Sequence, residues 1–451
     1  MKAKISILAL GAALGAAGVG LLPEARALLA GQAYAAGADT YKELNLFGDV
    51  FDRIRSDYVE KPDETKLIES AINGMLDSLD PHSSYMNAKA YRDMQVQTKG
   101  EFGGLGIEVT EEDGVIKVVT PIDDTPAAKA GIQSGDVIVE IDDEAAQGLT
   151  LDQAVDKMRG AVNSAVRLKI ERGPNKEVKE FKIVREIIKV QSVRSHVDGG
   201  DIGYIRITQF TEQTAEGLRS AMEKLRADLP GDKLKGYILD LRNNPGGLLD
   251  QSIEVVNSFI DHGEIVSTRG RNPDDAQRFS ARVGGDLSGG KPLVVLINGG
   301  SASASEIVSG ALQDHKRATL IGTRTFGKGS VQTIMPLGDN GALRLTTARY
   351  YTPSGRSIQA KGIDPDIEVL EPVPDDLKGK DDTKGEASLK GHLKNGEDEK
   401  SGSQAYVPPD EKDDTQLAAA IDLLHGVKRA SSAGDADKPT DASTPADAKP
   451  N

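Results

Sequence analysis

The chain has 451 residues, which is more than one ordinary domain holds, so two or three folded units are expected. It carries 55 Lys and Arg against 70 Asp and Glu, and the net charge of −15 would repel a phosphate backbone, which argues against nucleic acid as a partner. It has no cysteine, so covalent catalysis would need Ser, Thr, Lys or a carboxylate, and disulfides and cysteine metal sites are excluded.

The amino terminus has the pattern of an export signal. Lys2 and Lys4 precede an uncharged run over residues 5–22, and Ala33-Tyr34-Ala35 follows with the small residues of a cleavage site. We therefore interpret residues 1–36 as a signal peptide. The alternative is a retained membrane anchor, because the run just reaches spanning length, although it is rich in Gly and Ala and weakly apolar.

Residues 38–96 are predicted to form a helical amino-terminal region. Apolar residues recur there at the spacing of one helix face, in two stretches. The first contains Leu44, Phe47, Val50, Phe51 and Ile54, and the second Leu67, Ile68, Ala71, Met75 and Leu76.

Residues 97–185 read as a separate β-rich module. Short β-branched runs alternate with glycines, and the one helix-like stretch covers residues 151–159. The runs are GLGIEV, GVIKVVT, GDVIVEID and AVRLKIER.

Residues 186–370 change to a repeated order of strand, glycine loop and helix. The run GYILDLR leads into NNPGG, and PLVVLIN leads into GGSASAS, each followed by a helical pattern. Nearly continuous apolar strands that alternate with helices predict a parallel sheet covered on both faces. Ligands bind such sheets where the strands end, which is where both glycine loops are predicted to lie.

Residues 371–451 are interpreted as a low-complexity tail. Residues 371–412 contain no Ile or Phe and are rich in Asp, Glu, Lys, Gly, Ser and Pro, a composition typical of disorder. A short amphipathic helix is predicted near residues 413–428, and the remaining residues lack core-forming side chains.

A serine-rich loop, GGSASASE over residues 299–306, lies at a strand-to-helix junction. Amide N–H groups at a helix start carry partial positive charge and suit an oxyanion, so Ser301, Ser303 and Ser305 are candidate nucleophiles. The alternative is that these serines are capping residues and that Glu306 completes a capping box. The loop alone leaves both interpretations open.

A serine nucleophile needs a base, and the sequence offers histidine or lysine. Of the six histidines, His82 and His315 stand in sequence that looks ordered, but His315 is at a helix end, where it would cap the last carbonyls. Lys328, in TFGKGS, can serve as a base if burial lowers its pKa enough for the neutral amine to exist. A solvent-exposed lysine in a glycine loop is the alternative.

The segment from Gly322 to Lys328 also matches the first seven positions of a P-loop, which would indicate a nucleotide-binding protein. The next position is Gly329, where a P-loop needs Ser or Thr for magnesium. The following SVQTIMPL is a strand pattern, whereas a P-loop opens a helix that receives the phosphates. Nucleotide binding is therefore disfavoured.

Three segments stand in the order and with the spacing of a known family: GYILDLRNNPGGLL, NGGSASASEIVSGALQD and GTRTFGKGSVQ. They resemble the carboxyl-terminal processing peptidases, also called tail-specific proteases. The resemblance extends from DPHSSY at residues 80–85, through FGGLGI at residues 102–107, to GIDPD at residues 362–366. It implies an α/β multidomain fold in which a PDZ domain precedes a crotonase-like α/β peptidase core, and a serine endopeptidase that cleaves proteins near their carboxyl termini.

The resemblance also implies roles for individual residues. By position, the nucleophile falls on Ser303, the base on Lys328, and the residue that orients the lysine amine on Gln332. The oxyanion hole falls on the backbone N–H of Ala304 and of a glycine in NNPGG, either Gly246 or Gly247. The implied reaction is amide hydrolysis through an acyl-enzyme.

The β-rich module resembles a PDZ domain, which binds an extended carboxyl terminus as an added strand. The carboxylate-binding loop then falls on Gly104, Leu105, Gly106 and Ile107, for which a plain hairpin turn is the alternative. The family usually has another glycine where this chain has residues 161–164, a departure that concerns only the local turn.

The resemblance implies no cofactor and no metal. It implies envelope protein substrates with apolar tails, a homo-oligomer, possible dependence on an adaptor protein, and export to the periplasm or cell envelope. A catalytically idle adaptor that binds tails without cutting them is the alternative function, against which the complete set of Ser303, Lys328 and Gln332 argues.

Overall fold

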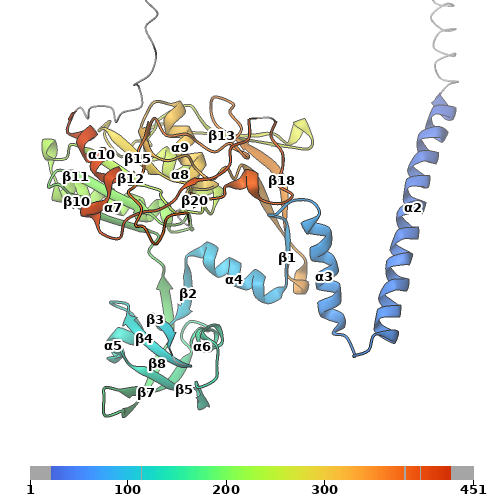
Figure 1. Cartoon of the computed structure of the whole chain (residues 1–451), viewed down its shortest axis with the longest axis horizontal. Coiled ribbons are helices and arrows are strands. Elements are labelled where there is room, and N and C mark those ends of the chain that lie inside the picture. The colour runs from blue at the N-terminus through green and yellow to red at the C-terminus, as the bar shows by residue number, and fades with distance from the viewer. Residues whose placement is uncertain (1–21, 113, 380–381, 397, 428–451) are drawn as a thin grey trace, which may run out of the picture. The chain divides into compact units, whose positions relative to one another are not determined.

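The computed structural model describes residues 22–427 apart from residues 113, 380, 381 and 397 (Figure 1). The chain divides into two compact units, Met1–Met75 and Leu76–Asn451. Most of the expected signal segment and residues 428–451 of the expected tail lie outside the described residues.

The first unit is helical, as predicted for this part of the sequence. Helix α2 covers Leu22–Asp57 and helix α3 covers Glu64–Asp77. Within the described part of the chain, no helix is both long and apolar enough to span a bilayer.

The second unit begins with strand β1 (Ser84–Met86) and helix α4 (Ala88–Lys99). The Asn87 side chain caps the start of α4 by accepting from the N–H of Ala90 at 3.0 Å. Gly100 ends the helix in the left-handed conformation, with φ +66°. Strand β2 (Glu101–Gly104) follows and pairs with β9 (Glu186–Lys189), so these two strands lead into and out of the β-rich module.

The β-rich module is built as predicted, around one antiparallel sheet in the order β3-β4-β5-β7-β8 with β6 beside β5. Its buried core includes Ile116, Ile138, Val166, Leu168 and Ile170. The strands are β3 (Ile107–Glu112), β4 (Val115–Pro121), β5 (Val137–Ile141), β6 (Glu144–Ala145), β7 (Ala165–Arg172) and β8 (Glu177–Val184), and the helices are α5 (Pro126–Ala130) and α6 (Leu151–Met158).

The larger part of the second unit contains the predicted parallel sheet. The strand order is β10-β11-β12-β15-β16-β19, and every pair is parallel except β10 with β11. The strands are β10 (Val193–Asp198), β11 (Ile202–Ile207), β12 (Gly236–Asp240), β15 (Leu293–Ile297), β16 (Thr319–Gly322) and β19 (Ile367–Glu368). All residues of β12 and β15 are buried, as expected for strands covered on both faces.

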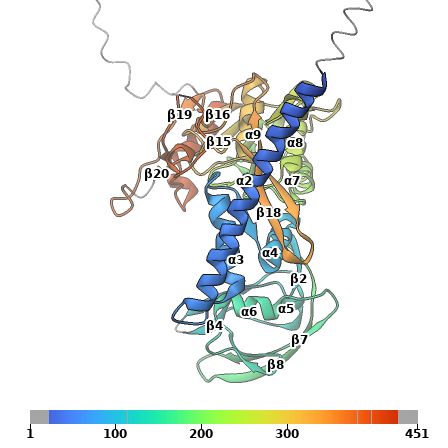
Figure 2. The ribbon, with the colours of Figure 1, turned by 90° about the vertical axis from the view of Figure 1, so that its right-hand side faces the viewer.

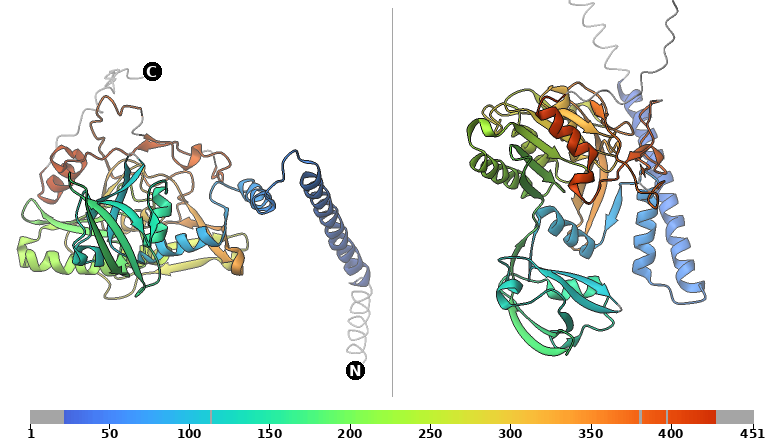
Figure 3. Two further views of the ribbon diagram at one scale, coloured as in Figure 1. Left: turned by 90° about the horizontal axis from the view of Figure 1, so that it is seen from below. Right: turned by 60° about the vertical axis from the view of Figure 1, so that its left-hand side comes forward.

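Helices cover both faces of this sheet. Successive strand residues point to opposite faces, so alternate residues of one strand pack against different helices. Helices α7 (Thr214–Asp228), α8 (Leu249–Asn257) and α9 (Ala304–Asp314) share one hydrophobic core with alternate strand residues such as Leu239 and Val295. The other face, with Ile238 and Leu296, packs against α10 (Thr415–Leu424), which lies on the sheet in Figure 3.

A second, antiparallel sheet runs in the order β1-β18-β13-β14, with β17 also paired to β18. Its long strand β18 (Ala342–Tyr351) is visible in Figure 2. The other strands are β13 (Glu264–Gly270), β14 (Gln277–Ser280) and β17 (Ser330–Pro336). Strand β17 begins two residues after Lys328, so this sheet positions the lysine loop.

The disorder expected for residues 371–412 is corrected by the structure, in which the described part of this segment follows a defined path. Strands β20 (Asp382–Thr383) and β21 (Ser403–Gln404) pair, and a 3-10 helix covers Glu386–Ser388. The segment is held by hydrogen bonds to the core: its Gln404 O accepts from the Thr323 hydroxyl at 2.6 Å and from the Gly299 N–H at 2.9 Å, and its Thr383 hydroxyl donates to Gly299 O at 2.9 Å. Composition predicts disorder only for a segment that finds no such partners.

Candidate active site

The two glycine loops lie side by side, as predicted. NNPGG follows β12 and GGSASAS follows β15, and these strands are parallel neighbours, so both loops leave the same edge of the sheet. The Ala302 N–H donates to Asn244 O at 2.9 Å and joins the loops directly.

The structure separates the three serines of the second loop by what their hydroxyls contact. Ser301 Oγ donates to Leu241 O at 2.8 Å, and Ser305 Oγ donates to Asn244 O at 3.0 Å, so both are buried structural groups. Ser303 is only partly buried and has φ +54° and ψ −110°, a conformation that L-residues rarely adopt. Such strain, of about 1–3 kcal/mol, concentrates at functional sites. Of the three candidate serines, Ser303 is therefore the one that the structure favours as the nucleophile.

Glu306 connects the serine loop to the lysine loop. Its carboxylate accepts from the N–H of Ser303 at 2.8 Å and, across the site, from the Thr325 hydroxyl at 2.6 Å and the N–H groups of Gly327 and Lys328 at 2.7 and 2.9 Å. Burial raises the pKa of Glu306 to about 7, opposed by these four hydrogen bonds. Glu306 therefore accepts from the Ser303 N–H before α9, as the capping interpretation predicted. It also binds the lysine loop, which was not predicted.

Lys328 is largely buried, and this desolvation lowers the pKa of its amine. The nearby carboxylate of Glu386 acts in the opposite direction, as do those of Glu306 and Asp80, while Arg344 adds to the lowering. The residues after Gly329 form strand β17, not a helix, so the loop lacks the helix start that a P-loop uses for phosphate.

Gln332 lies on β17, where its Nε2 donates to Ser330 Oγ at 2.9 Å and to Thr346 Oγ1 at 3.2 Å. Glu306 brings the backbones of Ser303 and Lys328 together, but among the residues that the structure describes, no hydrogen bond joins the side chains of Ser303, Lys328 and Gln332. The structure therefore brings the serine loop and the lysine loop together, but their three candidate side chains are not hydrogen-bonded to one another.

The backbone geometry distinguishes the two oxyanion candidates. A Cβ built on Gly246 would lie 2.9 Å from the Ala304 nitrogen, so the glycine loop reaches the first amide of α9. The Gly246 N–H, however, donates to Asn244 Oδ1 at 2.9 Å. For the Gly247 N–H, no acceptor is found within the described part of the chain. This favours Gly247 over Gly246 as the partner of Ala304.

A buried ion cluster lies where strand β12 leads into the NNPGG loop. Arg242 is 1% exposed and pairs with Asp240 at 2.7 Å and with Asp414 at 2.8 Å. Asp414 also caps α10 by accepting from the Leu417 N–H at 2.8 Å. Buried charges need such partners, so the start of α10 and the NNPGG loop are linked. The sequence showed the basic residue but not its distant partner.

The expected carboxylate-binding loop, Gly104 to Ile107, stands before a free sheet edge. Strand β3 starts at Ile107 and, in the part of the chain that the structure describes, pairs only with β4, while α6 lies against β3. Gly106 has φ +74°, and a Cβ there would lie 2.3 Å from the Thr125 side chain, so the turn requires glycine. An exposed edge beside a helix can accept an extended peptide.

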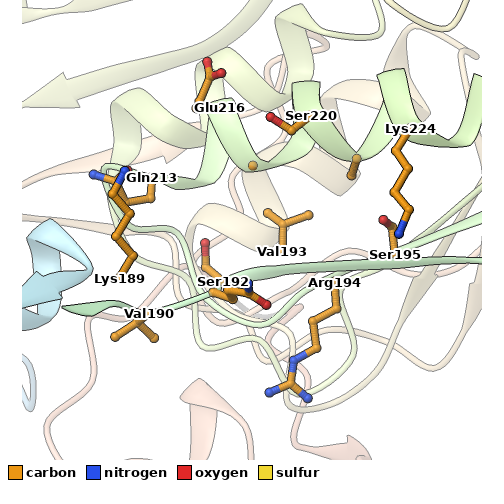
Figure 4. Close-up of a pocket in the computed structure, with 13 residues that line it drawn as sticks. Lys189, Val190, Ser192, Val193, Arg194, Ser195, Gln213, Glu216, Ser220 and Lys224 are labelled. Carbon is orange, nitrogen blue, oxygen red and sulfur yellow. The ribbon is translucent and has the colours of Figure 1, made fainter. Parts of the chain in front are cut away.

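A groove lies elsewhere in the second unit. It has a volume of about 500 Å³ between β10 and α7 (Figure 4). Val193 and Arg194 line it from β10, and Glu216 and Ser220 from α7. None of the predicted site residues lines this groove.

Comparison with known proteins decides the family. Residues 201–369 match peptidase family S41, residues 117–172 match the PDZ domain, and residues 9–90 match the activating protease CtpB N-terminal domain. A carboxy-terminal-processing protease of Bartonella bacilliformis is 60% identical over 390 residues, which cover 86% of this chain and 89% of that protein. The chain belongs to peptidase family S41.

Two other known proteins are similar to this chain at lower identity. The carboxy-terminal processing protease CtpA of Bacillus subtilis is 37% identical over 334 residues, which cover 74% of this chain and 70% of that protein. A solved photosystem II D1 C-terminal processing protease is 30% identical, with a TM-score of 0.42 over 74% of this chain and 95% of that chain. This S41 chain is thus a serine peptidase of the carboxy-terminal-processing type, with a PDZ domain and an α/β peptidase core.

Proposed function

We propose that this peptidase cleaves exported proteins near their carboxyl-terminal tails through an acyl-enzyme on Ser303, with Lys328 as the base. The observation that carries the proposal is the Glu306 carboxylate, which binds the backbone of both residues and so supports their approach. Export is supported by the pattern of residues 1–36, which resembles a signal peptide.

In the acylation step, the Ser303 Oγ attacks the scissile carbonyl carbon, and its proton passes to the neutral Lys328 amine. The N–H groups of Ala304 and Gly247 stabilise the resulting oxyanion. The tetrahedral intermediate then breaks its C–N bond, the Lys328 ammonium protonates the leaving amine, and an ester to Ser303 remains.

In the deacylation step, Lys328 accepts a proton from water as the water attacks the ester. Return of that proton to Ser303 Oγ releases the carboxylic acid product and restores the enzyme. Gln332 would orient the lysine amine through its Oε1 atom. Lowering of the pKa of Lys328 by burial supports both steps, because only the neutral amine accepts a proton.

Substrate selection is assigned to the PDZ domain, where the N–H groups of Gly104 to Ile107 would receive the terminal carboxylate and β3 would pair with the tail. Exposed apolar residues of α2, among them Leu44 and Phe47, support a homo-oligomer formed with a second copy of the chain.

The direct test is Ser303→Ala. We expect loss of peptide cleavage by roughly 1,000-fold or more with an unchanged melting temperature, because only the nucleophile oxygen is removed. Ser309→Ala is the matched control, since Ser309 lies on the same helix and its hydroxyl donates to Ser305 O at 2.7 Å. Cleavage by Ser303→Ala at the rate of the control would move the nucleophile to another residue. Tail binding without turnover by the wild-type protein would instead support the idle adaptor.

A further inference from the structure

Residues 382–404, which we name the C-terminal strap, pack against the serine loop. Gln404 O accepts from the Gly299 N–H at 2.9 Å, and Thr383 Oγ1 donates to Gly299 O at 2.9 Å. A Cβ on Gly299 would lie 2.3 Å from Ser403 O, so only glycine allows the strap this close. The strap therefore holds the start of the loop that carries the nucleophile.

Glu386 is the strap residue that reaches the lysine loop. Its N–H donates to Phe326 O at 3.0 Å, and its Oε1 accepts from Gln359 Nε2 at 2.9 Å. Gln359 Oε1 in turn accepts from the Gly329 N–H at 3.1 Å. Glu386 and Gln359 thus hold the backbone on both sides of Lys328.

The second oxygen of Glu386 is hydrogen-bonded to His82 Nε2 at 2.8 Å. His82 belongs to the loop before β1, in which Asp80 accepts from Ser83 and from the Thr346 hydroxyl of β18. With a side chain only 1% exposed, the Glu386 carboxylate joins three segments that are far apart in the sequence. A buried carboxylate persists only where such donors satisfy it.

The charged groups that act on the Lys328 amine come from four parts of the fold. Burial is the main influence and lowers the pKa of Lys328, and Glu386 is the strongest opposing charge. The four that act most strongly are Glu386 of the strap, Arg344 of β18, Glu306 of α9 and Asp80 before β1.

We propose that Glu386 is a positioning residue of this peptidase, and that the strap is a working part of its catalytic centre, fixing the Lys328 loop through Gln359 and Gly329. The proposal rests on the assignment of Lys328 as the base. It gives a catalytic purpose to a segment whose composition indicates only solvent-exposed polar chain.

The test begins with Glu386→Gln in the full chain. Glutamine keeps the shape, and its amide can donate to His82 once that ring changes tautomer, while the negative charge is lost. The amine of Lys328 then becomes neutral at lower pH. We expect the rising limb of kcat against pH to move down by roughly one pH unit, with KM unchanged.

A second variant separates position from charge. Gln359→Leu breaks the link to the Gly329 N–H and removes one donor to Glu386, whose carboxylate keeps its charge through the bond to His82. We expect a fall in kcat of roughly tenfold or more with the midpoint of the pH profile unchanged, because the loop is misplaced but its electrostatics are kept.

The matched control is Glu399→Gln. Glu399 lies on the same strap and is likewise bonded to a histidine, His392, at 2.9 Å, but it is not one of the four charges that act most strongly on Lys328. The midpoint of its pH profile should equal that of wild type. An equal shift in the Glu399 variant would overturn the role of the strap. The role would also be overturned if the pH profiles of the Glu386 and Gln359 variants coincided with that of wild type. If Lys328→Arg itself turned over at the wild-type rate, the base assignment would fail instead.

Discussion

At the scale of single residues, the proposed chemistry depends on one lysine, Lys328, whose surroundings lower its pKa. A neutral amine is scarce at pH 7 for a lysine with the ordinary pKa of 10.5, and burial of Lys328 lowers this value. Because the deprotonated form is the active one, the rate should rise with pH through the lowered pKa and then level. The carboxylates around the amine set the pH at which this rise occurs.

Replacement of this lysine by arginine distinguishes a base from an anion-holding cation. Arginine keeps the positive charge, but its pKa above ~12 leaves no neutral form at working pH. We expect Lys328→Arg to be about as inactive as Ser303→Ala at every pH. Labelling by a fluorophosphonate across pH measures acylation directly. Wild-type labelling by the arginine variant would show that Lys328 only holds an anion.

At the scale of elements, helix α10 completes the core although it lies in the part of the sequence predicted to be a tail. Leu417 is 3% exposed and packs with Ala420 against the face of the sheet formed by Ile238 and Leu296. Its first turn is tied to Arg242 through Asp414. The helix therefore supports the strand that leads into the NNPGG loop.

Truncation of this contact should destabilise the peptidase core. We expect Leu417→Ala to lower the free energy of unfolding by roughly 2–4 kcal/mol, the usual cost of a buried leucine with its residual cavity. The control is Leu423→Ala in the same helix, where the side chain is 38% exposed and the loss should stay below about 1 kcal/mol. Urea denaturation followed by circular dichroism measures both. Equal losses would mean that α10 does not depend on its packing face.

At the scale of the whole molecule, two functions are divided between separately folded parts. The PDZ domain has its own hydrophobic core, and the peptidase core has another. In the proposed function, the edge of β3 binds the tail of a substrate and the serine loop carries the chemistry. Selection of a tail and cleavage of the peptide should therefore respond to different changes in the substrate.

The division predicts a specific response to changes at the substrate carboxyl terminus. Amidation removes the anion that the N–H groups of Gly104 to Ile107 would bind, so KM should rise roughly tenfold or more. A terminal Asp should act similarly, because a PDZ domain that takes apolar tails would have to bury its charge. Acetylation of the same peptide at its amino terminus is the control and should have little effect. Equal KM values for all these peptides would show that the PDZ domain does not select tails.

The sequence by itself determined the order of domains, the parallel sheet and the two glycine loops. The spacing of apolar residues and the positions of glycines are local properties, which can be recognised in a short stretch of sequence. The sequence also pointed to Ser303 and Lys328 through motifs that are contiguous in the chain. Only the tertiary structure decided what lies across the site: Glu306 reaching the lysine loop, and Glu386 of the strap reaching Gln359. Composition failed for the strap because its order comes from hydrogen bonds to distant backbone groups, and no local pattern encodes such partners.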